Sequence, residues 1–141
     1  MKSIHKKIIL FFILAFSLNL AWEVSHSFLY DWSKLPLHND IYFYIPKILY
    51  STLGDLIFLT LIFAVISIKS GNLEWMNNPG KADYFKIIFL GLIIAIFIEV
   101  RAMLFQKWAY NELMPTIFGI GITPLIQLAL TGIFILWLIK K

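Results

Sequence analysis

Long apolar runs separated by short polar stretches dominate this chain of 141 residues. A helix needs about 20 residues to cross the hydrocarbon core of a membrane, and four runs reach that length. Because backbone groups in lipid must bond within their own segment, the runs predict helices rather than an open sheet. The predicted spans cover residues 8–30, 46–68, 85–105 and 117–139.

Polar and turn-forming residues separate the predicted helices. The run NNPG at 77–80 indicates a turn between the second and third helices, and 111–115 separates the third from the fourth. The segment 31–45 is longer and aromatic, so we expect it at the membrane interface. The second helix is then predicted to begin near Pro46, since proline is favoured at helix starts. In the fourth helix, Pro124 removes one backbone bond and predicts a kink.

Composition supports one membrane domain spanning 1–141. Hydrophobic residues make up 60% and charged residues 14% of the chain, whereas a soluble domain is about half apolar and about a quarter charged. The mean hydropathy is +0.83. The predicted fold class is therefore all-α, a polytopic four-transmembrane-helix bundle. The absence of cysteine excludes disulfides and thiolate sites, and no basic face or reader motif predicts a nucleic-acid partner.

The distribution of lysine predicts the orientation. Most of the basic residues fall on the side that carries both termini, so we expect both termini in the cytoplasm. A short apolar run after lysines is also typical of a signal peptide. Cleavage after Ala21 would place Asn19 at the third upstream position, which fits poorly, so we expect the segment to remain.

Polar side chains on the first two helices are predicted to face a common region. Asn19, Glu23 and His26 are spaced four and three residues apart and share one helix face, as do Ser51 and Asp55. With this orientation Glu23 lies roughly 8 Å and Asp55 roughly 13 Å below the outer hydrocarbon boundary. Both carboxyls therefore belong to the outer half of the bilayer.

The last two helices add polar groups at similar depth. Glu99 is expected near the depth of Glu23, and Arg101 either extends outward or reaches a neighbouring carboxylate. Small and polar residues can bring helices close and bond across them. In the fourth helix such a stripe recurs every four residues, at Gly119, Thr123, Gln127 and Thr131.

Charges at this depth require an explanation. An ionised carboxylate in the centre of a membrane helix costs about 2.5–3.5 kcal/mol on insertion scales. The groups can be protonated, pair with a cation, face water or hold a ligand. Several interpretations stay open: helix ends that reach the headgroups, a packed polar network, or a site. In the last case the catalytic candidates are Glu23, His26, Asp55 and Glu99, and the ligand-binding candidates are Asn19, Trp22, Thr123 and Gln127.

A metal site is not predicted. Glu23 and His26 have the Glu-x-x-His spacing of di-iron bundles, but such bundles use two copies of that motif. Motifs for nucleotide binding and nucleophilic catalysis are also absent from the chain. We therefore expect no cofactor.

Three stretches carry a resemblance: NLAWEVSHSFLY, YSTLGDL and EVRAMLFQKWAYNELMPTIFGIGITPLIQL. They resemble small, functionally uncharacterised four-helix membrane proteins of prokaryotes, which implies a multi-pass protein of the plasma membrane and no particular activity. Trp22, Glu23 and His26 are more distantly similar to sterol-isomerase-type domains, which move protons on lipids. Glu23 alone resembles the buried glutamate of small multidrug transporters.

The leading prediction is a carboxylate-lined pocket in the outer half of the bilayer. It would bind a lipid or small amphiphile, with acid–base chemistry by a carboxylate and His26. One alternative is a proton- or cation-coupled transporter acting as a homodimer. Another is a structural or accessory subunit whose acids only fix helix packing. The expected partners are membrane lipids and the amphiphilic ligand.

Overall fold

The computed structural model describes residues 2–34 and 40–140. The protein is largely helical, as predicted, and four helices are long and apolar enough to span a membrane. They are α1 (Lys2–His26), α2 (Ile41–Ser70), α3 (Lys81–Leu104) and α4 (Ile122–Ile139). The other described elements are two 3-10 helices, η1 (Ser27–Leu29) and η2 (Glu74–Met76), and a hairpin of β1 (Thr116–Ile117) and β2 (Ile120–Gly121).

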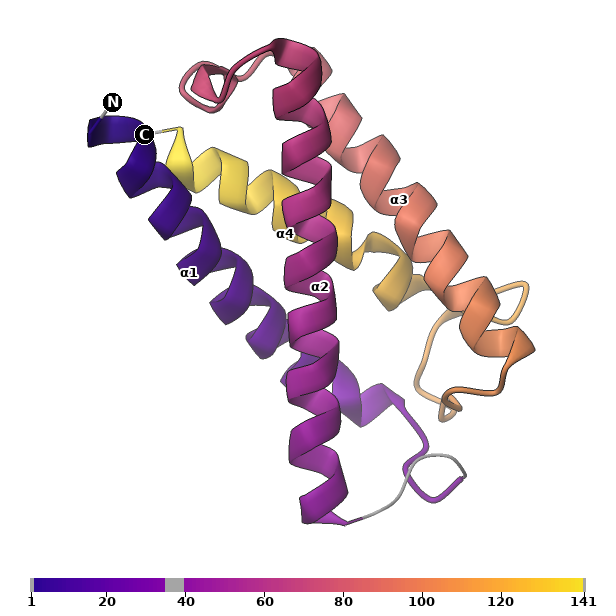
Figure 1. Ribbon diagram of the computed structural model, residues 1–141. Coiled ribbons are helices and arrows are strands. Elements are labelled where there is room, and N and C mark those ends of the chain that lie inside the picture. Colours follow the sequence, from indigo (N-terminus) through magenta and orange to yellow (C-terminus); the bar gives the residue numbers. More distant parts are fainter. Residues whose placement is uncertain (1, 35–39, 141) are drawn as a thin grey trace.

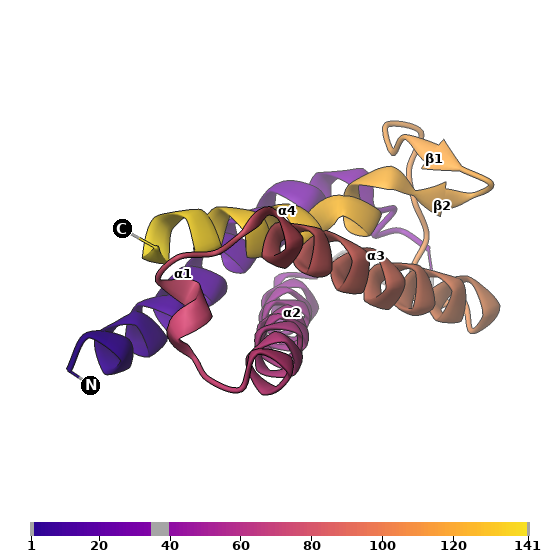
Figure 2. The ribbon, with the colours of Figure 1, turned by 90° about the horizontal axis from the view of Figure 1, so that it is seen from above.

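The helices form a layer with one helix across it. Helix α4 packs against both α3 and α1, and α2 lies across this layer and packs mainly on α1 (Figure 1). The view from above sets α2 apart from the other three helices (Figure 2). The start of α1, the end of α4 and the α2–α3 connection lie at one end, which we call the terminal end. We call the opposite end the distal end.

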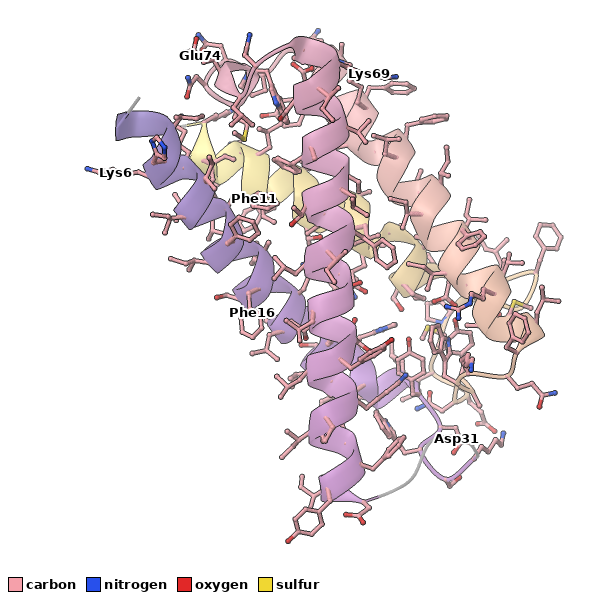
Figure 3. All side chains as sticks on the ribbon, viewed as in Figure 1. Lys6, Phe11, Phe16, Asp31, Lys69 and Glu74 are labelled. Atoms are coloured by element: carbon pink, nitrogen blue, oxygen red, sulfur yellow. The ribbon has the colours of Figure 1, made fainter. Side chains whose placement is uncertain are left out.

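The side-chain view marks the two ends. Lys6, Lys69 and Glu74 lie at the terminal end, and Asp31 lies at the distal end (Figure 3). Helices α2 and α3 come together near the terminal end and diverge toward the distal end (Figure 1).

Two glycines bring α3 and α4 close together. A Cβ atom at Gly91 would lie 2.9 Å from the backbone nitrogen of Ala129, and one at Gly132 would lie 2.7 Å from Cγ2 of Ile87. Such contacts are tolerated only where no side chain is present, so the glycines set this helix spacing. Packing from here toward the terminal end is apolar, with a core that includes Phe11, Leu59, Ile62, Phe63, Ile66, Ile135, Leu136 and Ile139.

The two distal connections bind each other. Tyr30 and Tyr110 form an isolated antiparallel bridge, and the backbone N–H of Asp31 donates to the carbonyl of Ala109 at 2.9 Å. These bonds join segments about 80 residues apart in sequence, a separation that follows from the helical hairpins between them. The aromatic residues of both connections consequently gather above the gap between α2 and α3.

The predicted start of the second helix was wrong. Helix α2 begins at Ile41, and Pro46 lies inside it. The reason is a cap, since the Asp40 carboxylate accepts a hydrogen bond from the backbone N–H of Tyr42 at 2.9 Å and satisfies a free donor of the first turn. The middle of the predicted interfacial connection, residues 35–39, lies outside the described residues.

The predicted start of the fourth helix was also wrong. The hairpin occupies its first residues, with Gly119 in a left-handed turn conformation at φ 80°, and α4 begins only at Ile122. Pro124 is then in the first turn, where a backbone N–H has no partner within the helix, so the expected loss of a bond and kink do not apply. Gly119 also drops out of the predicted stripe.

Candidate functional site

One amide connects three helices at the centre of the polar cluster. The side-chain Nε2 of Gln127 lies 2.6 Å from Oδ2 of Asp55, 3.0 Å from Oε1 of Glu23 and 3.2 Å from Oδ1 of Asn19. Gln127, Glu23 and Asn19 are buried, and Asn19 has no exposed surface. The structure therefore brings together four of the residues that the sequence predicted for a site.

The carboxyl groups of Glu23 and Asp55 also contact each other. Both accept a hydrogen bond from the same Gln127 nitrogen, at 3.0 Å and 2.6 Å, so the two acids lie side by side. Two acids at such distance cannot both ionise at low cost. The pair thus presents one donor and several acceptor positions on a single surface.

Glu99 is held by a separate chain of aromatic side chains. The Tyr110 hydroxyl donates a hydrogen bond to the Glu99 carboxylate, and Nε1 of Trp108 donates to the Tyr110 oxygen at 3.3 Å. Burial raises the pKa of Tyr110, and the hydrogen bond and charge of Glu99 raise it further. The pKa of Tyr30 is also raised, mainly by burial and to a smaller extent by the charge of Glu99. Both hydroxyls consequently remain protonated at neutral pH and can donate.

A cavity of about 570 Å³ joins these groups. Its polar wall includes Glu23, Asp55, Glu99 and Gln127, so both the carboxyl pair and the tyrosine-held glutamate face the same space. Ser51 and Gly54 of α2 also line it. Most of the remaining wall is apolar or aromatic and comes from α2, α3, α4 and the distal connections: Trp32, Ile48, Tyr50, Leu53, Ile57, Phe58, Ala95, Ile98, Ala102, Trp108 and Leu128.

Other predicted site residues do not line this cavity. His26 is buried behind it, where its Nε2 lies 2.6 Å from the Thr123 hydroxyl and its ring packs edge-on against Tyr30. Its Nδ1 has no hydrogen-bond partner within the described part of the chain. Asn19 and Trp22 likewise stand behind the wall, Asn19 as a partner of Gln127. The predicted acid–base pairing of a cavity carboxylate with His26 therefore has no direct contact in this geometry.

The structure adds residues that the sequence patterns did not assign to a site. Lys47 and Lys107 line the cavity, and so does Arg101, which forms no ion pair with any carboxylate in the described ranges. Trp108 also lines the cavity, and Tyr110 bonds to Glu99. Their positions depend on the pairing of the distal connections, for which a periodicity analysis gives no signal.

Residues 2–34 and 40–140 contain no group of three or more histidine or acidic side chains arranged to hold a metal ion. The Glu23 and Asp55 carboxyls instead accept hydrogen bonds from the Gln127 amide. The chemistry open to the site is hydrogen bonding and proton exchange with a guest molecule.

No family model, curated protein or solved structure matches this chain. The protein can therefore be described only from its own structure. It is a helical protein with four potential membrane spans and one acid-floored cavity described between α2 and α3.

Proposed function

We propose that this protein is a multi-pass membrane protein of a prokaryotic plasma membrane that binds a lipid or small amphiphile in the α2–α3 cavity. Both termini face the cytoplasm in this proposal, because lysines are concentrated at the terminal end. The cavity then opens in the outer half of the bilayer.

The size and lining of the cavity carry the proposal. Ligand pockets typically occupy about 300–1,000 Å³ and combine apolar walls with a few convergent polar groups. The cavity here has about 570 Å³ and an apolar wall over a floor of Glu23, Asp55 and Gln127. An amphiphile matches both parts, because its chain contacts the wall while a hydroxyl or amine reaches the carboxyls.

The position of the cavity favours access from the membrane. Leu53 and Ile57 line it, yet 49% and 59% of their surfaces are exposed on the outside of α2. Gly54 leaves open space beside them, since a Cβ there would meet nothing within 4 Å. We propose that an acyl chain enters from the bilayer beside Leu53 and Ile57, where Gly54 leaves open space.

The carboxyl pair gives the site a capacity for proton exchange. One member donates and the other accepts, which is the arrangement that general acid–base chemistry requires. A reaction would use Glu23 and Asp55 directly. His26 would only help to hold the neighbouring structure in place, through its contact with Thr123.

The packing of the terminal end argues against the transporter alternative. Between the cavity and that end, the described core is apolar and includes Leu59, Ile87 and Ile135, which have no exposed surface. A coupled transporter needs a polar path through this region in at least one state. A binding pocket closed at one end needs none.

Native mass spectrometry tests the proposal. The protein is released from detergent micelles with diacylglycerol or phosphatidylglycerol of identical acyl chains as probes. We expect one molecule of at least one probe to remain bound, and the double variant Glu23→Gln, Asp55→Asn to lose it by about tenfold or more in affinity. Glu112→Gln, at an exposed position, is the matched control.

Three results would contradict the proposal. Retention of the lipid by the double variant would mean that the carboxyls are not part of the site. Failure of the unmodified protein to hold either probe, with stability lowered only in the double variant, would favour a structural role. Flux driven by a pH gradient in proteoliposomes would instead favour transport.

A further inference from the structure

Three cationic side chains surround the distal part of the cavity. They come from α2, from the last turn of α3 and from the connection after it, and they form what we call the cationic rim: Lys47, Arg101 and Lys107. Arg101 and Lys107 are exposed and stand at the opening, whereas Lys47 is half-buried in the wall. Lys47 precedes Asp55 by eight residues on α2, so the backbone positions of these two residues lie about 12 Å apart along the helix.

None of the rim cations forms an ion pair within the described part of the chain. The ion pairs in the described part of the chain are Lys34 with Asp31 and Lys86 with Asp83, both away from the cavity. The acids of the floor are already engaged, since Glu23 and Asp55 bond to Gln127, and Glu99 bonds to Tyr110. The cavity therefore holds three cationic side chains that have no ion-pair partner within the described part of the chain.

The fold holds these cations in place. The ammonium of Lys47 lies 5.4 Å from the centre of the Trp108 ring, a cation–π contact that fixes it over the cavity. Two residues after the end of α3, Gln106 has a left-handed conformation at φ 48°. The backbone N–H of Lys107 then donates a hydrogen bond to the carbonyl of Ala102 at 2.9 Å. This closing turn directs the chain back across the helix end and brings Lys107 to the opening.

Electrostatics makes an empty rim costly. Lys47, Arg101 and Lys107 line the same cavity, and a charge without an ion-pair partner in a partly buried position keeps only part of its hydration. Arginine and lysine together are typical of sites for phosphate oxygens, which accept several charge-assisted hydrogen bonds at once. A phosphate group supplies the missing charge.

We infer that the amphiphile bound in this cavity carries a phosphate headgroup, held by Lys47, Arg101 and Lys107. The inference rests on the proposed lipid-binding function and names its ligand class. The phosphate occupies the rim, a hydroxyl or amine of the headgroup reaches toward the carboxyl floor, and the acyl chain leaves past Leu53 and Ile57. A free phosphate ion satisfies the rim alone, but it leaves the apolar wall and the floor without a partner.

The same two probes separate this inference from the proposed function, because diacylglycerol has the chains of phosphatidylglycerol but no phosphate. We expect native mass spectrometry to show phosphatidylglycerol bound one-to-one and at least about tenfold more tightly than diacylglycerol. The triple variant Lys47→Gln, Arg101→Gln, Lys107→Gln should remove that preference and leave diacylglycerol binding unchanged. Inorganic phosphate at millimolar concentration should not displace the bound lipid.

A matched control keeps the change in net charge equal. Lys6, Lys69 and Lys81 are exposed, lie outside the cavity and can be replaced together by glutamine. This variant should bind phosphatidylglycerol as the unmodified protein does. A loss equal to that of the rim variant would overturn the inference, since total charge would then explain the binding.

The remaining outcomes are distinguishable. Equal affinity for both probes, unaffected by the rim variant, would overturn the phosphate assignment and leave the lipid pocket standing. Phosphatidylglycerol that associates without a one-to-one limit would mean that the rim only contacts bulk headgroups. Displacement of the lipid by inorganic phosphate would assign the rim to the free ion. Binding of neither probe would count against the proposed function itself.

Discussion

Helices α3 and α4 pack closely at Gly91, which faces the backbone of Ala129, and at Gly132, which faces the side chain of Ile87, whereas α2 and α3 leave about 570 Å³ between them toward the distal end. The packed region contains few polar contacts and derives its stability from close van der Waals packing. The cavity region has a polar floor whose groups satisfy one another. One part of the bundle thus fixes the helices, and the other part remains open to a guest.

This difference separates stability from binding in a testable way. Changes in the packed region should weaken folding while the affinity for lipid stays the same. Changes on the cavity wall should alter affinity, and they should alter stability only where they leave a buried polar group without a partner.

The largest effect is expected at Gln127, which belongs to both parts. Gln127→Leu leaves Asn19, Glu23 and Asp55 without their shared donor, so we expect a loss of about 3 kcal/mol in unfolding free energy. Unfolding in detergent micelles with increasing denaturant measures it. Placing the same change in an Asp55→Leu background should reduce its cost by about 1 kcal/mol. Additive costs would mean that the amide and the carboxyl are not coupled.

A smaller loss is expected where α3 meets α4. Gly91→Ala places a methyl group 2.9 Å from the backbone nitrogen of Ala129 and should cost about 2 kcal/mol. Gly54→Ala is the matched control, because its methyl group would meet nothing within 4 Å and should gain up to about 1 kcal/mol in helix propensity. Similar effects at both glycines would contradict the close approach. Lipid affinity should not change in the Gly91 variant.

The smallest effect on binding is expected at His26. His26→Gln loses the contact with the Thr123 hydroxyl and should cost about 1 kcal/mol in stability, but its ring does not line the cavity. Affinity for phosphatidylglycerol should stay within about twofold, less than 0.5 kcal/mol. Thr123→Val should behave alike. A tenfold loss of affinity in either variant would mean that His26 contributes to lipid binding after all.

The sequence allowed the helices and the polar cluster to be predicted because both follow from local spacing. Apolar runs defined four spans, and intervals of three and four placed Asn19 and Glu23 on one face. Depth along antiparallel helices then brought Asp55 and Gln127 to the same level. These arguments use only distances along single helices.

The remaining features depend on contacts between distant segments. Tyr110 reaches Glu99 only because its connection pairs with Tyr30, about 80 residues earlier. Lys107 reaches the cavity through a left-handed turn at Gln106, a residue type with no strong preference for that conformation. The late start of α4 follows from a hairpin that is too short to have a recognisable pattern.

The central claim is that an amphiphile occupies the α2–α3 cavity, and thiol protection tests it most directly. The natural chain has no cysteine, so Ser51→Cys places a single thiol on the cavity wall, with Ser33→Cys as the exposed control at the same end. We predict that phosphatidylglycerol slows maleimide labelling at position 51 but not at position 33. The protection should disappear when Glu23→Gln and Asp55→Asn are added. Labelling at position 51 that is equally fast with and without the lipid would contradict the account.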